Sequence, residues 1–372
     1  MSKSLFTALL IISFNGIADE SVITDVKGQL SSNYLTANSS KEWQHQALLR
    51  YIPDFTIEKT LSNDYLLDFN VSVNTFANYQ SDPDSDFSSN LSLYRINSQF
   101  KTSQSDIRLG LQKINFGPAL LLRSLRWFDQ LNPTDPLQLT DGVYGIRYRY
   151  FFLNNANIWS WVLYGNKDLK GYERVASKEN TPELGARLQY PLESGELGIA
   201  FHSRQVENLG FSNESVGKDL LEKRFAMDGR WDLELGIWFE YVLIDQGAGS
   251  KSDTNWVNRL TTGADYTFAI GNGLHIVAEH LINAISDTAI TWDQKFHTSA
   301  LQLSYPIGLL DAVSLIQMYS WTQEQSFHSL RWTRTYDNWM LSLNAFISPD
   351  QPGNNMLGLS GNGIQATVVF NH

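Results

Sequence analysis

The sequence contains no cysteine. It therefore cannot form disulfide bonds or a thiolate metal site, and it offers neither a cysteine nucleophile nor a cysteine for lipid attachment. Basic residues are also in deficit, because 28 lysines and arginines stand against 39 aspartates and glutamates and give a formal net charge of −11. Nucleic-acid binding favours a basic surface, so we expect no nucleic-acid partner.

Long apolar runs are rare, and the clearest one lies near the N-terminus. Leu5 to Phe14 is almost uniformly apolar, but it is too short to cross a bilayer as a helix, which takes about 20 residues. Lys3 precedes the run, and residues 16–18 follow it as a small-x-small triplet. This pattern predicts a cleaved signal peptide over residues 1–18, export of the chain, and a mature protein of residues 19–372.

Motifs of catalysis are missing as well. The sequence has no Gly-x-Ser-x-Gly elbow, no His-Glu-x-x-His pair and no phosphate-binding glycine loop. His202 and Ser203 are adjacent in a predicted strand, where they point to opposite faces and cannot act together as base and nucleophile. We therefore expect no enzymatic activity and no cofactor.

What the sequence has in abundance is the alternation of apolar and polar residues. This period of two occurs in residues 66–75 and recurs in residues 183–190, 234–241 and 339–348. It predicts strands with one apolar and one polar face. In the first segment the apolar set is Leu67, Phe69, Val71 and Val73, and the polar set is Asp68, Asn70, Ser72 and Asn74.

Brief connectors between the predicted strands alternate with connectors that are mostly longer. Membrane barrels have short turns at one rim and longer loops at the other, so the chain is predicted to be all-β, a transmembrane antiparallel β-barrel. Eight brief and nine longer connectors give about eighteen strands, and merging one hairpin would give sixteen. The brief connectors are expected at residues 61–64, 102–105, 153–157, 193–196, 232–233, 271–273, 308–312 and 336–338, and the longer ones at 37–43, 79–90, 117–141, 166–182, 206–224, 245–256, 284–294, 323–327 and 349–363.

Aromatic residues make up 13% of the chain, with 11 tryptophans and 16 tyrosines. In membrane barrels such rings gather at the level of the lipid headgroups. Several lie near the ends of predicted strands, where we expect two aromatic girdles. These residues are Trp43, Trp159, Trp161, Tyr164, Trp256, Trp321, Trp332 and Trp339.

The last predicted strand, Ile364 to Phe370, has apolar residues at alternate positions and ends in an aromatic residue. With the alternation, the connectors and the girdles, this pattern resembles the bacterial outer-membrane porins over essentially all of the mature chain, without a motif that selects a subfamily. The resemblance implies a location in the bacterial outer membrane, contact with lipid and lipopolysaccharide, and recognition of the last strand by the barrel-assembly machinery. It is compatible with an oligomer.

The longest connector, residues 117–141, lies between the fifth and sixth predicted strands. In porins the loop at this place folds into the lumen and narrows it, and the resemblance implies the same here. The segment is rich in apolar residues, which need a surface to pack against. They are Ala119, Leu120, Leu121, Leu122, Leu125, Trp127 and Phe128.

Charged residues in and after this segment are candidates for a pore constriction. We expect Arg147 and Arg149, on the next strand, to face the lumen opposite Asp129 and Asp135, where they would select solutes by charge. An equally open interpretation is that these arginines pair with loop carboxylates and hold the loop. The remaining candidates are Arg123 and Arg126 in the loop and Arg108 and Arg187 on neighbouring strands.

A second segment, Asp82 to Asp86, carries alternating carboxylates. These could bind calcium or bridge lipopolysaccharide phosphates through a divalent ion. The glycine and glutamate of an EF-hand loop are missing, so a solvated loop is the favoured interpretation and no metal site is assigned.

The favoured function is a porin-like outer-membrane channel that passes small hydrophilic solutes or ions through a charged constriction, since about eighteen strands enclose a water-filled lumen. The alternatives are a non-conducting barrel that acts as a receptor or sleeve for an envelope partner and, less favoured, an outer-membrane enzyme. The inward positions show no sustained basic ladder or aromatic slide, so neither phosphate nor sugar selectivity is indicated.

Overall fold

The computed structural model describes residues 22–39, 42–62, 64–81, 85–129, 137–173, 175–206, 220–247, 256–349 and 361–372. The predicted signal peptide lies outside these ranges. Within them, no helix is long and apolar enough to cross a membrane.

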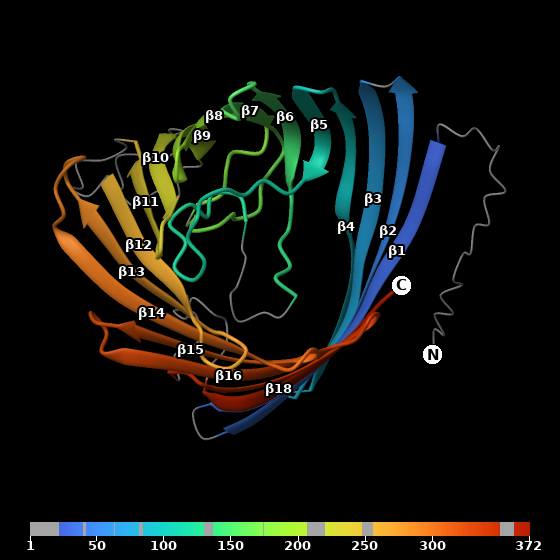
Figure 1. The fold of residues 1–372 in the computed structure, drawn as a ribbon, viewed down its shortest axis with the longest axis vertical. Coiled ribbons are helices and arrows are strands. Elements are labelled where there is room, and N and C mark those ends of the chain that lie inside the picture. Colours follow the sequence, from blue (N-terminus) through green and yellow to red (C-terminus); the bar gives the residue numbers. More distant parts are fainter. Residues whose placement is uncertain are drawn as a thin grey trace.

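The described residues form eighteen strands in a single antiparallel sheet (Figure 1). Strands that follow one another in sequence are neighbours in the sheet, and β1 pairs with both β2 and β18, so the sheet closes into a barrel. The prediction of eighteen strands is confirmed, and the sixteen-strand alternative is excluded. The strands are β1 (Val22–Ser39), β2 (Glu42–Ser62), β3 (Tyr65–Gln80), β4 (Asp86–Lys101), β5 (Ser105–Gln112), β6 (Val143–Phe151), β7 (Asn157–Leu163), β8 (Glu183–Leu192), β9 (Gly195–Val206), β10 (Leu220–Asp232), β11 (Gly236–Asp245), β12 (Trp256–Phe268), β13 (Leu274–Ser286), β14 (Gln294–Ile307), β15 (Asp311–Ser320), β16 (Gln325–Thr335), β17 (Trp339–Ile347) and β18 (Asn362–Asn371).

The barrel is sealed where its first and last strands meet. β1 and β18 pair from Gln29 and Asn371 to Asn38 and Asn362. The pairing continues one step further, because the backbone N–H of Gly28 donates to His372 O at 2.9 Å and the N–H of His372 donates to Gly28 O at 3.0 Å. His372 therefore bonds directly to the first strand.

The two faces of each strand follow the predicted alternation. On β8, Leu184 and Leu188 lie half-exposed on the outer face, whereas Glu183 and Arg187 are buried on the inner face. Adjacent residues of a strand point to opposite sides, so the outer face is apolar and the inner face carries the polar and charged groups.

The connectors lie where the alternation places them, but several are shorter than predicted, and two of these are short turns in place of loops. β1 continues to Ser39 and β2 begins at Glu42, so residues 37–43 are mostly strand. β16 likewise begins at Gln325, which leaves a turn at residues 321–324 in place of the expected loop at 323–327. In both places polar residues that suit a loop continue the sheet because the neighbouring strand offers them backbone partners.

Most of the expected girdle residues lie near strand ends, and Trp43, Trp321 and Trp339 are exposed. The prediction that Trp159 and Trp161 belong to a girdle is wrong. Both lie on the inner face of β7 and are buried, at 8% and 2% exposure. Their sequence position near a strand end does not reveal on which side of the wall they lie, and the inside of the barrel is packed at this level.

Candidate pore and inserted loop

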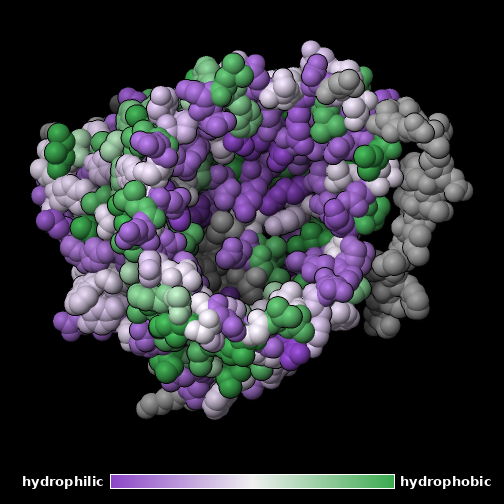
Figure 2. All heavy atoms as spheres, in the orientation of Figure 1, coloured by the Kyte–Doolittle hydropathy of each residue, from purple (hydrophilic) through white to green (hydrophobic). Residues whose placement is uncertain are grey.

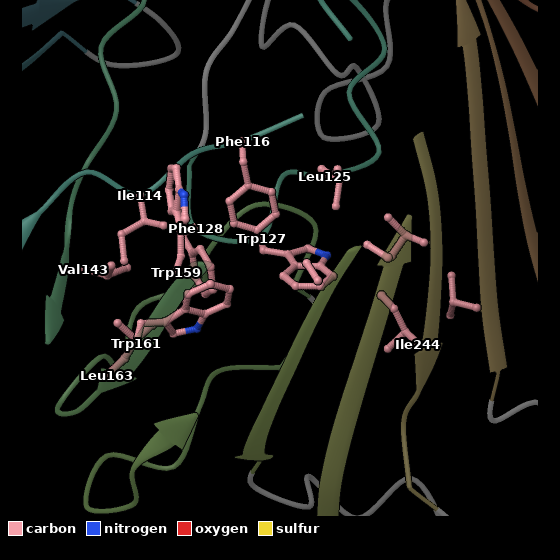
Figure 3. Close-up of a cluster of buried hydrophobic side chains, with 14 residues drawn as sticks. Ile114, Phe116, Leu125, Trp127, Phe128, Val143, Trp159, Trp161, Leu163 and Ile244 are labelled. Carbon is pink, nitrogen blue, oxygen red and sulfur yellow. The ribbon is translucent and has the colours of Figure 1, made fainter. Parts of the chain in front are cut away.

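The connector between β5 and β6, residues 113–142, enters the barrel; we call it the inserted loop (Figure 1). Figure 3 shows Phe116, Trp127 and Phe128 of this loop beside Trp159 and Trp161 of β7. The ring centroids of Phe116 and Trp127 are 5.6 Å apart, as are those of Phe128 and Trp161, both in edge-to-face geometry. Such pairs bury large apolar areas and fix the mutual orientation of the rings.

A second apolar cluster lies further round the barrel. Ala119, Leu121 and Leu122 of the inserted loop pack against inward side chains of β11 and of β13 to β17. The described part of the loop therefore joins two apolar clusters whose wall residues extend from β6 to β17. The wall residues of this second cluster are Trp238, Val277, Leu281, Ala300, Ile316, Met318, Phe327 and Phe346, with Ala37 of β1 and the partly buried Leu35.

Glu240 of β11 anchors the loop through its backbone. The fully buried carboxylate accepts a hydrogen bond from Ala119 N at 3.0 Å and another from Leu125 N at 2.9 Å. The loop passes so close that a Cβ on Gly117, whose φ is +98°, would lie 2.3 Å from Glu240 Oε1. A glycine is therefore required here.

Glu279 of β13 provides the second anchor. It accepts hydrogen bonds from Leu120 N at 2.6 Å, from Leu121 N at 3.0 Å and from Leu122 N. Trp238 Nε1 also donates to it, at 3.1 Å. Two buried carboxylates thus satisfy a series of backbone N–H groups that would otherwise lack partners inside the barrel.

The connector between β7 and β8, residues 164–182, reinforces this arrangement. The ring of Tyr172 lies between two guanidinium groups, 4.8 Å from Arg126 of the inserted loop and 4.4 Å from Arg259 of β12. Gly171 touches the inserted loop so closely that a Cβ would lie 1.6 Å from Arg126 O. The two connectors therefore pack as one unit.

A buried ionic network joins this connector to the inner faces of β8, β9 and β10. Arg224 bonds to Glu222 at 2.6 Å and to Glu173 at 2.8 Å, and Arg204 bonds to Glu222 at 2.7 Å and to Glu173 at 3.1 Å. Mutual pairing of this kind keeps buried charge tolerable. The full network consists of Lys170, Glu173, Ser177, Glu183, His202, Arg204, Glu222 and Arg224.

A different stretch of the inner wall, on β2 to β5, remains open. Figure 2 shows a hollow in the middle of the barrel, with hydrophilic residues gathered on the side where β3 to β6 lie in Figure 1. A pocket of about 250 Å³ lies against this wall. It is lined by Thr56, Asp68, Asn70, Arg95, Asn97, Arg108 and Lys113.

This pocket holds more positive than negative charge. In the described part of the chain Arg95, Arg108 and Lys113 form no ion pair, and the one lining carboxylate, Asp68, is bonded to Lys101 at 3.3 Å. Arg108 donates to Gln99, and Arg95 donates to Thr140 O of the inserted loop at 2.8 Å. The carboxylates of Asp54 and Asp141 act on Arg95 from nearby, and that of Asp129 acts on Lys113, so the positive field of this pocket is only partly offset.

Lys113 stands where the inserted loop leaves β5. Burial lowers the pKa of its ammonium group from the usual value, while the carboxylate of Asp129 acts in the opposite direction. An anionic solute beside Lys113 would favour the charged form.

Two of the predicted constriction residues lie next to this pocket. Arg147 is buried and bonds to Asp106 of β5 at 3.1 Å. Arg149 has no acidic partner among the described residues, and its guanidinium group lies 4.0 Å from the ring centre of Trp159. Arg108 is the neighbour of Arg147 across the β5–β6 ladder. The structure thus brings Arg108, Arg147 and Arg149 together on one stretch of wall.

The other candidates are distributed differently. Arg123 and Asp129 are both buried and bond to each other within the inserted loop. Arg126 contacts Tyr172. Arg187 is buried against Asp228 and beneath the ring of Phe116. Asp135 lies outside the described residues.

Sequence reasoning missed Arg95, Lys113 and the anchors Glu240 and Glu279. The alternation in residues 234–241 already placed Glu240 on the inward face, so a carboxylate among apolar neighbours was the available signal. Arg95 follows a register shift between β3 and β4, where Ser72 faces Arg95 and Val73 faces Leu93, and this shift hides the local period.

The described residues contain no group of three or more His, Asp or Glu side chains that could hold a metal ion. Asp82 and Asp84 of the calcium candidate lie outside the described ranges.

Comparisons with known proteins find no matching family model and no matching curated protein. Solved structures do match. OccAB2 of Acinetobacter baumannii has a TM-score of 0.60 at 9% identity, over 94% of this chain and 98% of that one. The outer membrane channel DcaP of the same organism has a TM-score of 0.52 at 10% identity, over 96% and 99%.

A third match is an anion-selective porin from Comamonas acidovorans, with a TM-score of 0.50 at 12% identity, over 94% of this chain and 100% of that one. Likenesses at such low identity show the fold. The chain therefore has the fold of the bacterial outer-membrane porins, a closed barrel whose apolar outer face suits a bilayer.

Proposed function

We propose that this protein is a porin-like channel of the bacterial outer membrane, and that its passage favours small anionic solutes. The observation that carries the proposal is the division of the inner wall. The inserted loop packs against β7 to β17, and the wall left open on β2 to β5 carries Arg95, Arg108 and Lys113 without ion-pair partners in the described part of the chain.

The expected selectivity follows from simple electrostatics. One unit charge acting on an ion about 8 Å away in water contributes about 0.5 kcal/mol, which is about a twofold preference. Several such charges act in the same direction here. Salt weakens the effect, because the screening length shortens as ionic strength rises.

Further support comes from what the open wall lacks. The one carboxylate that lines the pocket, Asp68, is bonded to Lys101, and the nearby carboxylates of Asp54 and Asp141 form no ion pair with Arg95 among the described residues. An anion passing here would replace the missing partners of Arg108 and Lys113. The chain's overall charge of −11 does not oppose this, because the field at the passage is set by the nearest groups.

The test is the reversal potential of the purified protein in planar bilayers under a salt gradient. The wild type should form discrete conductance steps and favour chloride over potassium. The double variant Arg108→Gln/Lys113→Gln should lower the anion-to-cation permeability ratio by about fivefold at low salt, because two charges leave the passage.

Lys295→Gln is the matched control, since this exposed lysine lies on β14 outside the open wall. Its ratio should equal that of the wild type. An unchanged ratio in the double variant would remove the cationic wall from the passage. Absence of conductance steps in the wild type would favour the non-conducting receptor or sleeve.

A further inference from the structure

The fourth strand of the barrel has a long stretch without a neighbour on one side. β3 pairs with β4 from Asp86 to Lys101, whereas β5 pairs with it only from Ile96 to Lys101. β5 ends at Gln112, where the chain turns into the barrel as the inserted loop, and Figure 1 shows β5 as a much shorter ribbon than β4. Residues 86–95 of β4 therefore have an edge that no strand of the barrel covers.

We call Asp86 to Leu93 the open edge. In the part of the chain that the structure describes, no backbone hydrogen bond joins these residues to any element other than β3. At about 3.3 Å per residue the open edge is about 26 Å long. Exposed edges are commonly protected by lysine or proline, and the open edge contains neither. Its backbone groups are thus available to another strand.

The side chains of the open edge also lack a neighbour. Register with β3 places Leu91 and Leu93 on the outer face of the wall. Leu91 is 73% exposed, whereas Leu188, on the outer face of β8 with a strand on either side, is 44% exposed. An added strand with apolar residues on its outer face would cover this bare flank, because side chains directly opposite one another on paired strands touch.

A cavity of about 460 Å³ lies beside the open edge. Asn90, Ser92 and Leu93 line it from β4, and the inserted loop and the connector between β7 and β8 line it from the opposite side. The side chain of Asn166 fixes that connector to β6, because it donates to Tyr144 O at 3.0 Å and accepts from Tyr144 N at 2.8 Å. The open edge thus faces a cavity with a fixed opposite wall.

Two carboxylates give this cavity a negative character. Asp141 and Asp168 both line it and are exposed, and neither forms an ion pair within the described ranges. Lys170, which also lines the cavity, is buried and bonds to Glu183 at 3.1 Å. Arg95 attracts Asp141 from nearby, but its guanidinium group donates to backbone carbonyl groups. A cation of suitable reach would therefore find two carboxylates without an ion-pair partner.

We propose that the open edge is a docking site for an extended, cationic peptide segment of a second protein, which adds to the barrel wall as a strand. Its backbone would pair with β4, and a basic side chain would lie beside Asp141 and Asp168. A small amine would satisfy the carboxylates but leave the backbone edge unpaired, so a peptide is the occupant that meets both. The open edge belongs to the rim of the longer connectors, which faces the outside of the cell in outer-membrane barrels.

This proposal goes beyond the channel function and does not rest on it. The docking site uses the edge of the wall and the two carboxylates, whereas the passage uses Arg108 and Lys113 inside the barrel. Reversal potentials of the same preparations report on the passage alone. Failed docking with normal anion selectivity would sink only the docking site, and lost selectivity with intact docking would sink only the channel proposal.

The first test measures binding of a synthetic peptide to the purified protein by fluorescence anisotropy. The probe is a capped peptide of about ten residues that alternates valine and threonine and carries one central lysine. We expect saturable binding by the wild type and a Kd about fivefold higher for Asp141→Asn/Asp168→Asn at low salt, because two charges leave the cavity. Asp287→Asn/Glu324→Gln, which removes two exposed carboxylates from other connectors of the same rim, should bind like the wild type.

A control peptide with a methyl group on every backbone nitrogen keeps the side chains and the charge but cannot donate backbone hydrogen bonds. It should not bind. Equal binding of the methylated peptide would overturn the proposal, because the backbone edge would then have no part in docking. No binding of the unmodified peptide by the wild type would overturn it as well, and so would an equal loss of affinity in both double variants.

The second test locates the bound peptide, and the absence of cysteine from the chain makes an introduced thiol unique. Ser89→Cys lies on the outer face of the open edge. Gln205→Cys is the matched control, since β10 pairs with one edge of this residue and Lys178 N donates to its carbonyl group at 2.9 Å. A peptide that carries one cysteine should form a disulfide at least tenfold faster with the first variant than with the second.

Equal rates for the two cysteine variants would overturn the proposal, because they indicate random collisions. A disulfide-linked product of two chains from Ser89→Cys without peptide would assign the open edge to a second copy of this chain and would overturn it too.

Discussion

The two sides of the inner wall use charge in opposite ways. On the covered side, from β7 to β17, acidic and basic groups are buried in matched sets such as Arg224 with Glu173 and Glu222. On the open side, Arg95, Arg108 and Lys113 line a pocket without ion-pair partners in the described chain. Paired charge holds loops in place, and unpaired charge beside water acts on whatever passes. In the function proposed above, the same residue types thus serve structure on one side and permeation on the other.

Removing both anchors of the inserted loop should have the largest effect. Glu240→Ala combined with Glu279→Ala leaves the backbone N–H groups of residues such as Ala119 and Leu125 unpaired, and each lost bond to a carboxylate costs about 1.5 to 3 kcal/mol. The thermal midpoint of the heat-induced gel shift should fall, and single-channel conductance should rise and become noisy. Asp265→Asn, a partly exposed inward carboxylate, is the control. An unchanged conductance would mean that the loop stays in place without its anchors.

Breaking the ionic network should come next. Glu222→Ala leaves Arg204 and Arg224 short of a buried partner, which costs about 3 to 5 kcal/mol. Urea unfolding in detergent or lipid should show this loss. Arg50→Gln, on the inner face of β2, should change stability by no more than about 0.5 kcal/mol. A similar loss of stability in both variants would contradict the idea that charges are structural on the covered side and not on the open side.

On the open side, a single charge should alter permeation without altering stability. Arg149→Gln removes a cation that has no acidic partner among the described residues, so the anion-to-cation ratio should fall about twofold at low salt. Reversal potentials measure the ratio, and the unfolding midpoint should remain that of the wild type. A fall in stability with no change in ratio would assign Arg149 to packing against Trp159 instead.

The smallest effect should come from removing a matched pair on the same wall. Asp106→Asn combined with Arg147→Gln takes away one negative and one positive charge that lie 3.1 Å apart. The net charge of the wall is preserved, so the permeability ratio should stay within measurement error of the wild type. A shift as large as that of Arg149→Gln would show that position, rather than net charge, governs selection.

The strands and connectors were predictable from the sequence because their signals are local. The period of two in residues 183–190 requires no knowledge of the neighbouring strands, and it places Arg187 correctly on the inner face. Which inward charges remain free depends on pairing across the sheet. Arg187 meets Asp228 because β8 and β10 flank β9, where only Gly198 lies between them, and no spacing within either segment announces that contact.

The same limit explains the misplaced tryptophans and the missed cations. Trp159 and Trp161 lie near the ends of a short strand, but the inserted loop makes the inner side of that strand as apolar as its outer side. Arg95 follows a bulge that interrupts the alternation. The local pattern thus predicts the strands of the wall. Which side chains pack inside the lumen depends on contacts that exist only in the closed barrel.

The joining of His372 to Gly28 has a consequence for how the barrel forms. The sheet closes only when its first and last strands pair. A sheet with fewer strands would have two open edges, and each edge would expose a row of unpaired backbone groups to lipid. Assembly must therefore hold the growing edge until the final strand arrives. The pairing of β18 with β1 decides whether all the other strands can remain in the bilayer.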